Sequence, residues 1–555
     1  MAAGMAGSEA MALGGLGLPV NRQKLLFWFQ LGALAYAVYF YFTVKVQSVE
    51  VFLTLGLLAF LCLLPSYLWC AGKAHGLPIM PVFALGMFPA YILPIQTDSQ
   101  VLAGYDAELQ LKALLSACGL MVVMTGIWHQ LCNHAFSGPP RCRLLDLSKA
   151  TWLLVTFMVL GLLFQVAGLL FFKYGGGAFA MVRGYTGNGA TLALFAFSFQ
   201  LGQGKLSPPM RIFLFAIVGA QIVVDSVSFI LAGTLVKLGI LLAGYTLGSQ
   251  KIPWKSALAA LSVLVVLHAG KADMRKAYWR EGSGDVHFSL AEYPRILAEW
   301  VQAGCKTLVT GRTREDQEQA AAAERAAMVP VFLRVLSLTP EKVPFLEGET
   351  YRTIPSLLVP RVLNEKKGVA HIGNWILAYV YGYLQVEELG KTSIAFDLMI
   401  EAYANYGFPG VLGLGMVLGL FFGWVGGLSQ GVPLLSFRFL LAVAVLSGTL
   451  GSNNTGGVFV TTIWQSFLAL TTLNILLMKT MPNPLYTKPK AGRKGERIED
   501  RGGRIEGEEV SSRKSVVGSH PSAISDLPSV GQVAPVRHER PKRFVYEKKN
   551  NRKIL

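Results

Sequence analysis

Long apolar runs separated by short polar turns dominate the pattern of hydrophobic and polar positions in this chain. Runs of about 20 residues with few charges are long enough to cross a bilayer as helices. They lie at residues 25–44, 50–71, 78–96, 110–132, 151–173, 189–203, 211–229, 230–248, 256–270, 408–428, 434–450 and 457–478. The pattern predicts an all-α polytopic membrane protein with about twelve transmembrane helices.

Two of these segments depart from a plain apolar run. The segment 78–96 contains four prolines, so it is either a spanning helix or a re-entrant one. The apolar stretch 211–248 is too long for one span. We divide it at Asp225-Ser226, the first polar pair within it.

The predicted helices divide the chain into five parts. These are an N-terminus over 1–24, transmembrane helices 1–9 over 25–270, a large polar loop over 271–407, transmembrane helices 10–12 over 408–478 and a basic tail over 479–555. Within the loop, residues 286–302 and 316–337 carry apolar side chains at helical spacing, which predicts amphipathic helices lying against the membrane or the bundle. The tail has few apolar residues and is predicted to be disordered.

The basic residues of the short loops predict the orientation. Lys and Arg gather on the cytoplasmic side of membrane proteins. With the N-terminus inside, the cytoplasmic side receives Arg22, Lys24, Lys73, Arg141, Arg143, Lys149, Lys205, Arg211, Lys251, Lys255, Arg438 and the basic tail. The sequence therefore predicts that both termini are cytoplasmic and that the large loop is periplasmic.

The composition supports a membrane protein and narrows the classes of molecule that it is expected to bind. Hydrophobic residues make up 53% of the 555 residues and charged residues only 15%, whereas soluble domains have about 25% charged residues. The net charge is +17, and the tail alone, from Lys479 onward, carries 18 basic and 9 acidic residues. The tail lacks any recognisable nucleic-acid module, so we expect contacts with membrane lipids and none with nucleic acid.

The six cysteines carry no metal-binding or redox motif. They show no C-x-x-C spacing and no cluster with histidine, so we expect neither a structural disulfide nor a zinc site. Charges inside the spans are few, namely Asp225, Lys237, His268 and Arg438, and a structural role is the simpler interpretation for each. Without matching midplane charges or an internal repeat, a transporter is less favoured than an enzyme that receives lipid-linked substrates.

Four glycines at four-residue spacing mark the first span after the loop. They are Gly415, Gly419, Gly423 and Gly427. Such a stripe allows a neighbouring helix to approach closely. It predicts packing and carries no information about chemistry.

The segment Gly348–Lys367 of the loop gathers basic residues between prolines. Arg352 and Arg361 stand beside Pro355 and Pro360, and Lys366-Lys367 follows. Guanidinium groups suit the oxygens of a diphosphate, whose negative charge grows as it leaves a sugar. The alternative interpretation is a solvated basic turn.

With these residues in view, the chain resembles the O-antigen (oligosaccharide repeat-unit) polymerase family, of the Wzy type. The resemblance rests on a late outer loop, on the pattern Gly348-Glu349-Thr350, Pro360-Arg361 and Lys366-Lys367, and on a second motif leading into the next span. The residues that fit this second motif are Glu401, Tyr403, Asn405, Tyr406, Gly407 and Gly410. In this chain Gly368 follows the lysine pair, where the family often has proline.

The resemblance implies a processive glycosyltransferase of the bacterial inner membrane. It would move a growing glycan from one undecaprenyl diphosphate carrier onto a repeat unit held by another, without a metal or nucleotide-sugar cofactor. A flippase and a chain-length regulator would be partners. The product would be a surface polysaccharide, namely O-antigen, capsule or exopolysaccharide.

The resemblance also assigns roles to individual residues. Arg361, Arg352 and Arg183 would hold the donor diphosphate, with Lys366 and Lys367 adding positive potential. Glu401 would accept a hydroxyl proton or orient a sugar, or it is a structural carboxylate bonded to backbone. Further sugar contacts are expected from His371, Tyr403, Asn405 and Arg280.

Two alternative functions stay open. An O-antigen ligase relative would share the outer loop and the diphosphate leaving group but transfer the glycan to a different acceptor. A polysaccharide transporter or a non-catalytic assembly subunit would show repeat symmetry and would not cluster Arg352, Arg361 and Glu401.

Overall fold

The computed structural model describes most of the chain that precedes the tail. The described residues are 22–46, 48–97, 102, 104–134, 138–170, 177–227, 229, 231–278, 290–310, 327–359, 368–389, 394–449 and 454–486. All of them lie in one compact unit, Met1–Lys490. The prediction of a disordered tail concerns residues outside this described part, apart from its first eight, 479–486.

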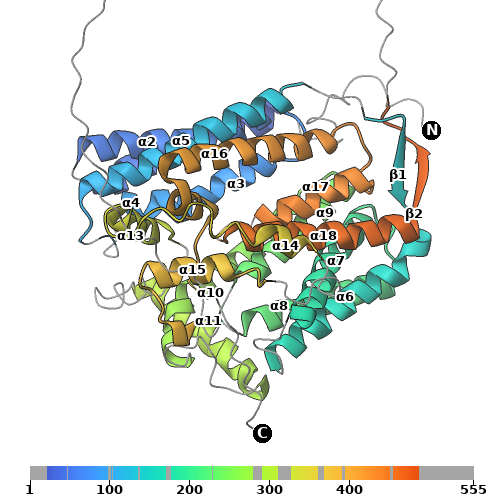
Figure 1. The fold of residues 1–555 in the computed structure, drawn as a ribbon. Helices are drawn as coiled ribbons and strands as arrows, with labels where there is room; N and C mark the ends of the chain where they lie inside the picture. Colours follow the sequence, from blue (N-terminus) through green and yellow to red (C-terminus); the bar gives the residue numbers. More distant parts are fainter. Residues whose placement is uncertain are drawn as a thin grey trace, which may run out of the picture. The chain divides into compact units, whose positions relative to one another are not determined.

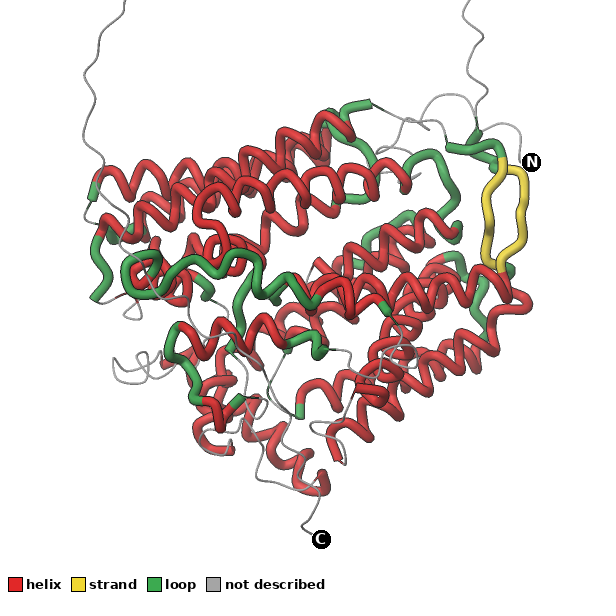
Figure 2. Tube along the Cα trace, viewed as in Figure 1, coloured by secondary structure: helices red, strands yellow, loops and turns green. Residues whose placement is uncertain are grey.

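The described part is helical nearly throughout, with one small sheet (Figures 1 and 2). The elements in chain order are α1 (Arg22–Thr43), α2 (Val49–Cys70), α3 (Ile79–Met87), η2 (Phe88–Ile92), α4 (Leu93–Gln96), α5 (Ala107–Cys132), β1 (Arg141–Leu145), α6 (Leu147–Leu170), α7 (Gly177–Gly202), α8 (Pro208–Ser226), α9 (Ala232–Ser249), α10 (Trp254–Tyr278), η4 (Leu290–Glu292), α11 (Tyr293–Thr310), α13 (Val329–Leu338), α14 (Ile354–Leu358), α15 (Ile372–Val380), η5 (Val386–Glu388), α16 (Leu398–Leu428), α17 (Phe437–Thr449), α18 (Gly456–Leu477) and β2 (Met478–Pro482).

Membrane-spanning helices form the body of the protein. Ten helices of the described part are long and apolar enough to cross a bilayer, and each of the predicted apolar runs coincides with a helix wherever it is described. The proline-containing run is one of the ten, built from α3, a π-helical turn and α4. The protein is therefore an all-α polytopic membrane protein, as the hydrophobic pattern predicts.

The helices pack in two groups that meet at α17 and α18. In the first group α16 lies along α5, which also packs against α2 (Figure 1). In the second group α7 packs between α6 and α9. Helix α18 contacts both α7 and α17, and α17 contacts α16. This arrangement leaves α16 and α18 on either side of the site described below.

The two ends of the bundle differ. At one end, strand β1 pairs antiparallel with β2, from Arg141 opposite Pro482 to Leu145 opposite Met478. We call this the sheet end. At the other end, helices α16 and α18 begin beside the segment 346–358. We call this the loop end.

The glycine stripe of α16 packs closely against a neighbouring helix, α5, at three of its four positions. An added Cβ would lie 3.0 Å from the Leu120 carbonyl oxygen at Gly415 and 2.8 Å from that of Met124 at Gly419. The third member, Gly423, meets the side chain of Leu131, whereas nothing lies within 4 Å of a Cβ at Gly427. Three of the four glycines therefore allow the close approach of the two helices.

Helix α16 begins earlier than the hydrophobic pattern places it. It begins at Leu398 instead of 408, capped by Asp397, whose carboxylate accepts the Ile400 N–H at 2.8 Å and the Tyr91 hydroxyl. The polar residues between 398 and 407 favour a loop in the hydrophobic pattern. Two of them, Glu401 and Asn405, fit in the helix because they are buried and bond to backbone and side chains of neighbouring segments.

Helix α7 also begins earlier, at Gly177 instead of 189, so Arg183 lies in a helix and not in a loop. The division of the long apolar stretch at Asp225-Ser226 is confirmed, since α8 ends at Ser226 and α9 begins at Ala232. Lys237 forms an ion pair with Asp225, which also accepts the Gln165 side-chain N–H at 2.8 Å.

Two loop segments form the predicted amphipathic helices. The buried residues of α11 lie on one face, and Trp300 donates its indole N–H to the Leu267 carbonyl of α10 at 2.7 Å. Helix α13 packs against α5 and α16 instead. Residues 286–289 and 316–326 of these predicted segments lie outside the described part.

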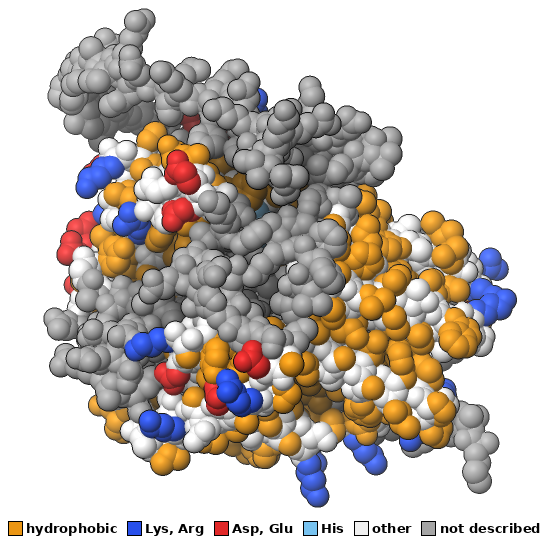
Figure 3. Space-filling model, turned by 90° about the horizontal axis from the view of Figure 1, so that it is seen from below, with side chains coloured by type: hydrophobic (Ala, Val, Ile, Leu, Met, Phe, Trp, Pro, Cys, Tyr) orange, Lys and Arg blue, Asp and Glu red, His pale blue; other side chains and the backbone are white. Residues whose placement is uncertain are grey.

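Apolar side chains also cover much of the outer surface. Seen from below, they form a broad area with lysine and arginine side chains along parts of its rim (Figure 3). An apolar surface of this extent is unfavourable in water and suits the hydrocarbon of a bilayer.

Candidate functional site

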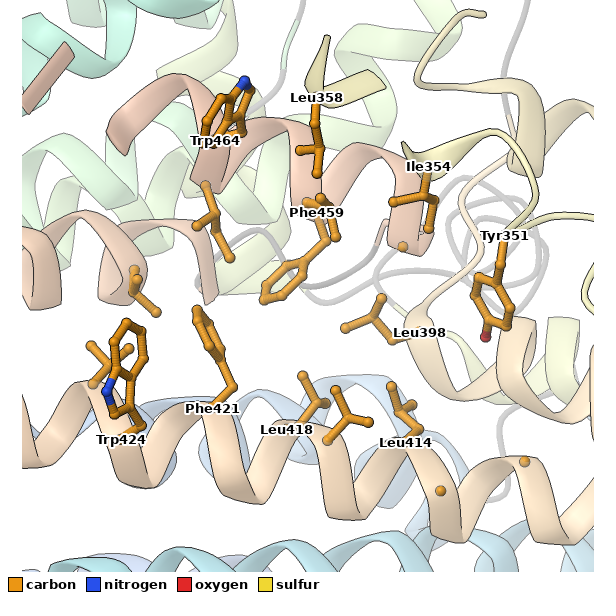
Figure 4. Close-up of a pocket in the computed structure, with 18 of the residues that line it drawn as sticks. Tyr351, Ile354, Leu358, Leu398, Leu414, Leu418, Phe421, Trp424, Phe459 and Trp464 are labelled. Atoms are coloured by element: carbon orange, nitrogen blue, oxygen red, sulfur yellow. The ribbon is translucent and has the colours of Figure 1, made fainter. Parts of the chain in front are cut away.

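A long apolar groove lies between α16, α17 and α18. Its volume is about 970 Å³. Side chains of α16 face those of α18 and α14 across it, and Figure 4 shows Leu414, Leu418 and Phe421 opposite Phe459 and Leu358. Its lining on α16 extends from Leu398 to Val425, and the part from Pro409 to Val425 alone corresponds to about 24 Å of helix.

The two ends of the groove differ in chemistry. Tyr351 lies at the loop end, whereas Trp424 and Trp464 lie toward the opposite end (Figure 4). Among the described residues of the lining, only Tyr351 and Tyr406 carry hydroxyl groups. A molecule in this groove would place an apolar chain among the aliphatic and aromatic side chains and its polar part at the loop end.

Asn405 ties the loop segment to α16. Its side-chain oxygen accepts the Gly348 N–H at 2.9 Å, and its side-chain nitrogen donates to the Thr350 hydroxyl at 2.8 Å. The backbone adds two bonds, from Leu346 N–H to the Ala404 carbonyl and from Glu347 N–H to the Asn405 carbonyl. Asn405 is fully buried, so its expected sugar contact stays a prediction that would require movement of this segment.

Glu401 ties α16 to α18 one helical turn earlier. Its carboxylate is fully buried and accepts the Gly456 backbone N–H at 2.5 Å. The preceding residue, Thr455, donates its hydroxyl to the side-chain oxygen of Asn374 in α15. In this structure Glu401 joins helices, which corresponds to the structural alternative of the sequence analysis, and its catalytic role stays a prediction.

The motif ends in a kink of α16. Gly407 has φ +65° and ψ −152°, a conformation that essentially only glycine adopts. An added Cβ there would lie 3.0 Å from the ring of Phe345.

Tyr403 packs edge-on against the rings of Phe332 and Phe345. It therefore holds the loop segment against α13, and its expected sugar contact stays a prediction.

Arg352 lies beside the groove, directly after Tyr351. Its side chain is 68% exposed and has one ion-pair partner in the described part, Glu349, at 3.6 Å. A long, exposed ion pair is weak. The guanidinium of Arg352 is therefore accessible to an anion.

Arg183 and His371 come together from distant parts of the chain. Arg183 is exposed on α7, with its guanidinium 6.0 Å from the ring of Phe179. His371 stands at the surface just before α15, and its neighbour Ala370 packs against Gly457 of α18. The pKa of His371 is lowered mainly because the surrounding protein desolvates the imidazole. The positive charge of Arg183 lowers it further.

The first turn of α18 is where these segments converge. Gly456 is approached by Tyr351, Ile354 and Glu401, and Gly457 by Ala370. Thr455 caps this helix without a side-chain bond to its backbone. The remaining predicted residues, Arg280, Arg361, Lys366 and Lys367, lie outside the described part.

Two residues of the groove were not predicted as site residues. Tyr351 stands beside Arg352 in the basic segment, and Tyr406 belongs to the second motif. Their rings stack at 6.5 Å with an angle of 24° between planes. Sequence alone offers no signal for this pairing, because the two tyrosines come from separate segments whose contact depends on Asn405.

The arrangement combines an apolar groove with an exposed arginine that directly follows a lining residue at its loop end, and a lipid with an anionic head group requires both features. No protein-family model matches the chain, and no curated protein and no solved structure is detectably similar to it.

Proposed function

We propose that this protein is a membrane glycosyltransferase that polymerises lipid-linked oligosaccharide repeat units for a bacterial surface polysaccharide. The observation that carries the proposal is the apolar groove whose hydroxyl-bearing end lies beside Arg352. An isoprenoid chain would occupy the groove, and its diphosphate would meet the guanidinium. On this proposal the loop end is periplasmic, both termini are cytoplasmic, and about twelve helices span the inner membrane.

The proposed reaction joins an acceptor hydroxyl to the donor sugar. The hydroxyl oxygen forms a bond to the anomeric carbon, and the bond from that carbon to the diphosphate oxygen breaks. The lipid diphosphate leaves with the bonding electron pair, and the hydroxyl proton passes to a base or to water. Arg352 would stabilise the charge that develops on the departing oxygen.

Other residues would support this step from different positions. Arg183 and His371 stand near the same turn of α18 and would contact a phosphate or sugar further from the groove. Glu401, buried against Gly456, would act through the position of α18. The backbone N–H groups of this helix start would add to the positive potential at the site.

Deletion of the gene in its host tests the proposal. Lipid-linked and surface glycans would be separated by size on a gel. Single repeat units should accumulate and long chains should disappear, and the wild-type gene should restore them. Long chains retained on the carrier lipid would instead favour the ligase alternative, and unchanged glycans would contradict the proposal.

A further inference from the structure

At the loop end of the groove two tyrosines stack, which the binding of an isoprenoid chain does not require. Tyr351 and Tyr406 both line the groove, and their rings stack nearly parallel. Tyr406 is 50% exposed. Neither phenol hydroxyl makes a hydrogen bond within the described part of the chain. Two available hydroxyls therefore stand at the point where an apolar groove meets polar surroundings.

The two tyrosines are held in place from several directions. Tyr406 immediately precedes the kink at Gly407. Its hydroxyl packs against Gly348, where an added Cβ would lie 2.2 Å away, and Gly348 has φ +87°. The ring of Tyr351 packs against Gly456, 3.4 Å from the position of an added Cβ. An aromatic pair positioned in this way loses little conformational freedom when it binds a ligand.

The pair fits one chemical class of ligand. A pyranose ring has an apolar face of C–H groups and a rim of hydroxyls, and a tyrosine offers an apolar ring face with a polar tip. Burial raises the pKa of Tyr351 above its ordinary range, which keeps its phenol a hydrogen-bond donor. Arg352 is the next residue along the chain, so a diphosphate at its guanidinium would lie next to the aromatic pair.

We propose that Tyr351 and Tyr406 form the subsite for the sugar that is attached directly to the lipid diphosphate. The inference rests on the proposed function and goes beyond it by separating sugar recognition from recognition of the lipid chain and diphosphate. The ring faces bind the apolar face of the pyranose, and the two hydroxyls bond to its rim. The subsite therefore discriminates glycosylated carrier lipid from bare carrier lipid.

Binding measurements on the full chain in lipid nanodiscs test this subsite. The probes are undecaprenyl diphosphate and undecaprenyl diphosphate bearing a single N-acetylglucosamine. Tyr406→Leu and Tyr351→Leu should each weaken binding of the glycosylated probe roughly tenfold, since about 1.4 kcal/mol of lost aromatic contact corresponds to that factor. Binding of the bare probe should change little. Tyr406→Phe, which keeps the ring, should lose less than Tyr406→Leu.

The matched control is Tyr41→Leu. Tyr41 is 73% exposed near the end of α1, outside the groove. The Tyr41→Leu protein should bind both probes as the wild type does. Equal weakening of both probes by Tyr406→Leu, or no weakening of either, would overturn the subsite while leaving the proposed function intact. A wild-type protein that binds neither probe would overturn both.

Discussion

The Glu401 carboxylate accepts the backbone N–H of Gly456 at 2.5 Å, which ties the first turn of α16 to the first turn of α18. One turn further along α16, Asn405 binds Gly348 and Thr350 of the loop segment. The described part of the first motif, Gly348 to Thr350, and the second motif therefore form one structural unit at the loop end of the groove. This unit sets the position of Arg352 relative to the apolar lining.

Replacement of Arg352 should abolish polymer formation and leave the protein in the membrane. A lost charge-assisted contact to a leaving diphosphate lowers a rate by about a hundredfold or more, whereas an exposed arginine contributes little to stability. Polymer length on a gel and protein level by immunoblot would be measured for Arg352→Ala. Arg295→Ala is the matched control, because Arg295 is also 68% exposed and also has a glutamate partner at 3.6 Å. Full polymer in Arg352→Ala would contradict the role of this arginine.

Replacement of Asn405 should loosen the loop segment. Asn405→Ala removes buried hydrogen bonds to Gly348 and Thr350 and leaves their polar groups without these partners, which should cost about 2–4 kcal/mol. Thermal unfolding and proteolysis of the purified protein would both report the change. The control is Asn188→Ala, since within the described part of the chain the Asn188 side chain bonds only to a carbonyl of its own helix. Equal stability of the two variants would show that the Asn405 hydrogen bonds do not hold the loop segment against α16.

The kink of α16 should depend on glycine. Gly407→Ala places a Cβ in a backbone conformation that it disfavours, 3.0 Å from the ring of Phe345, and should destabilise the protein by about 1–3 kcal/mol. In Gly427→Ala the added methyl meets nothing within 4 Å, so stability should be unchanged or slightly higher. Midpoints of thermal unfolding would be compared for the two variants. An unaffected Gly407→Ala protein would show that the kink is not required.

A bulky side chain in the groove should block the proposed substrate. Val417 lines the groove, whereas the neighbouring Met416 does not. Val417→Trp should remove polymer because the indole fills space that the lipid chain needs. Met416→Trp should keep polymer, since its side chain faces away from the groove. Polymer in both variants at wild-type length would indicate that the groove does not hold the substrate.

Protonation of His371 should lower stability at mildly acidic pH. The folded protein holds the pKa of His371 below its ordinary value of 6.5, so the unfolded chain binds the proton first as pH falls. Stability is therefore retained above pH 6.5 and declines as pH falls from there toward the lowered value. Unfolding temperatures between pH 8 and pH 5 should decline less in His371→Asn than in the wild type. Identical declines would contradict this assignment.

The hydrophobic pattern was sufficient to predict the membrane-spanning helices, because a backbone that crosses a bilayer can adopt few structures other than a helix. A run of apolar residues must satisfy its N–H and C=O groups internally, and a helix does so from local sequence alone. The break at Asp225-Ser226 and the packing role of Gly419 follow from equally local rules, and both are observed. The resemblance to a polymerase family and the roles of Arg361, Lys366 and Lys367 remain sequence-based predictions.

The site itself depended on contacts that no local pattern encodes. The stretch from Glu401 to Gly407 appears as loop in the hydrophobic pattern but lies in α16, where Glu401 bonds to Gly456 and Asn405 bonds to Gly348 and Thr350. Arg183 reaches His371 only through the packing of α7 against α18. The Tyr351–Tyr406 pair likewise requires two segments to fold together. Sequence determined which segments enter the membrane, and only the tertiary structure decided which side chains meet, because such pairings depend on how the helices pack.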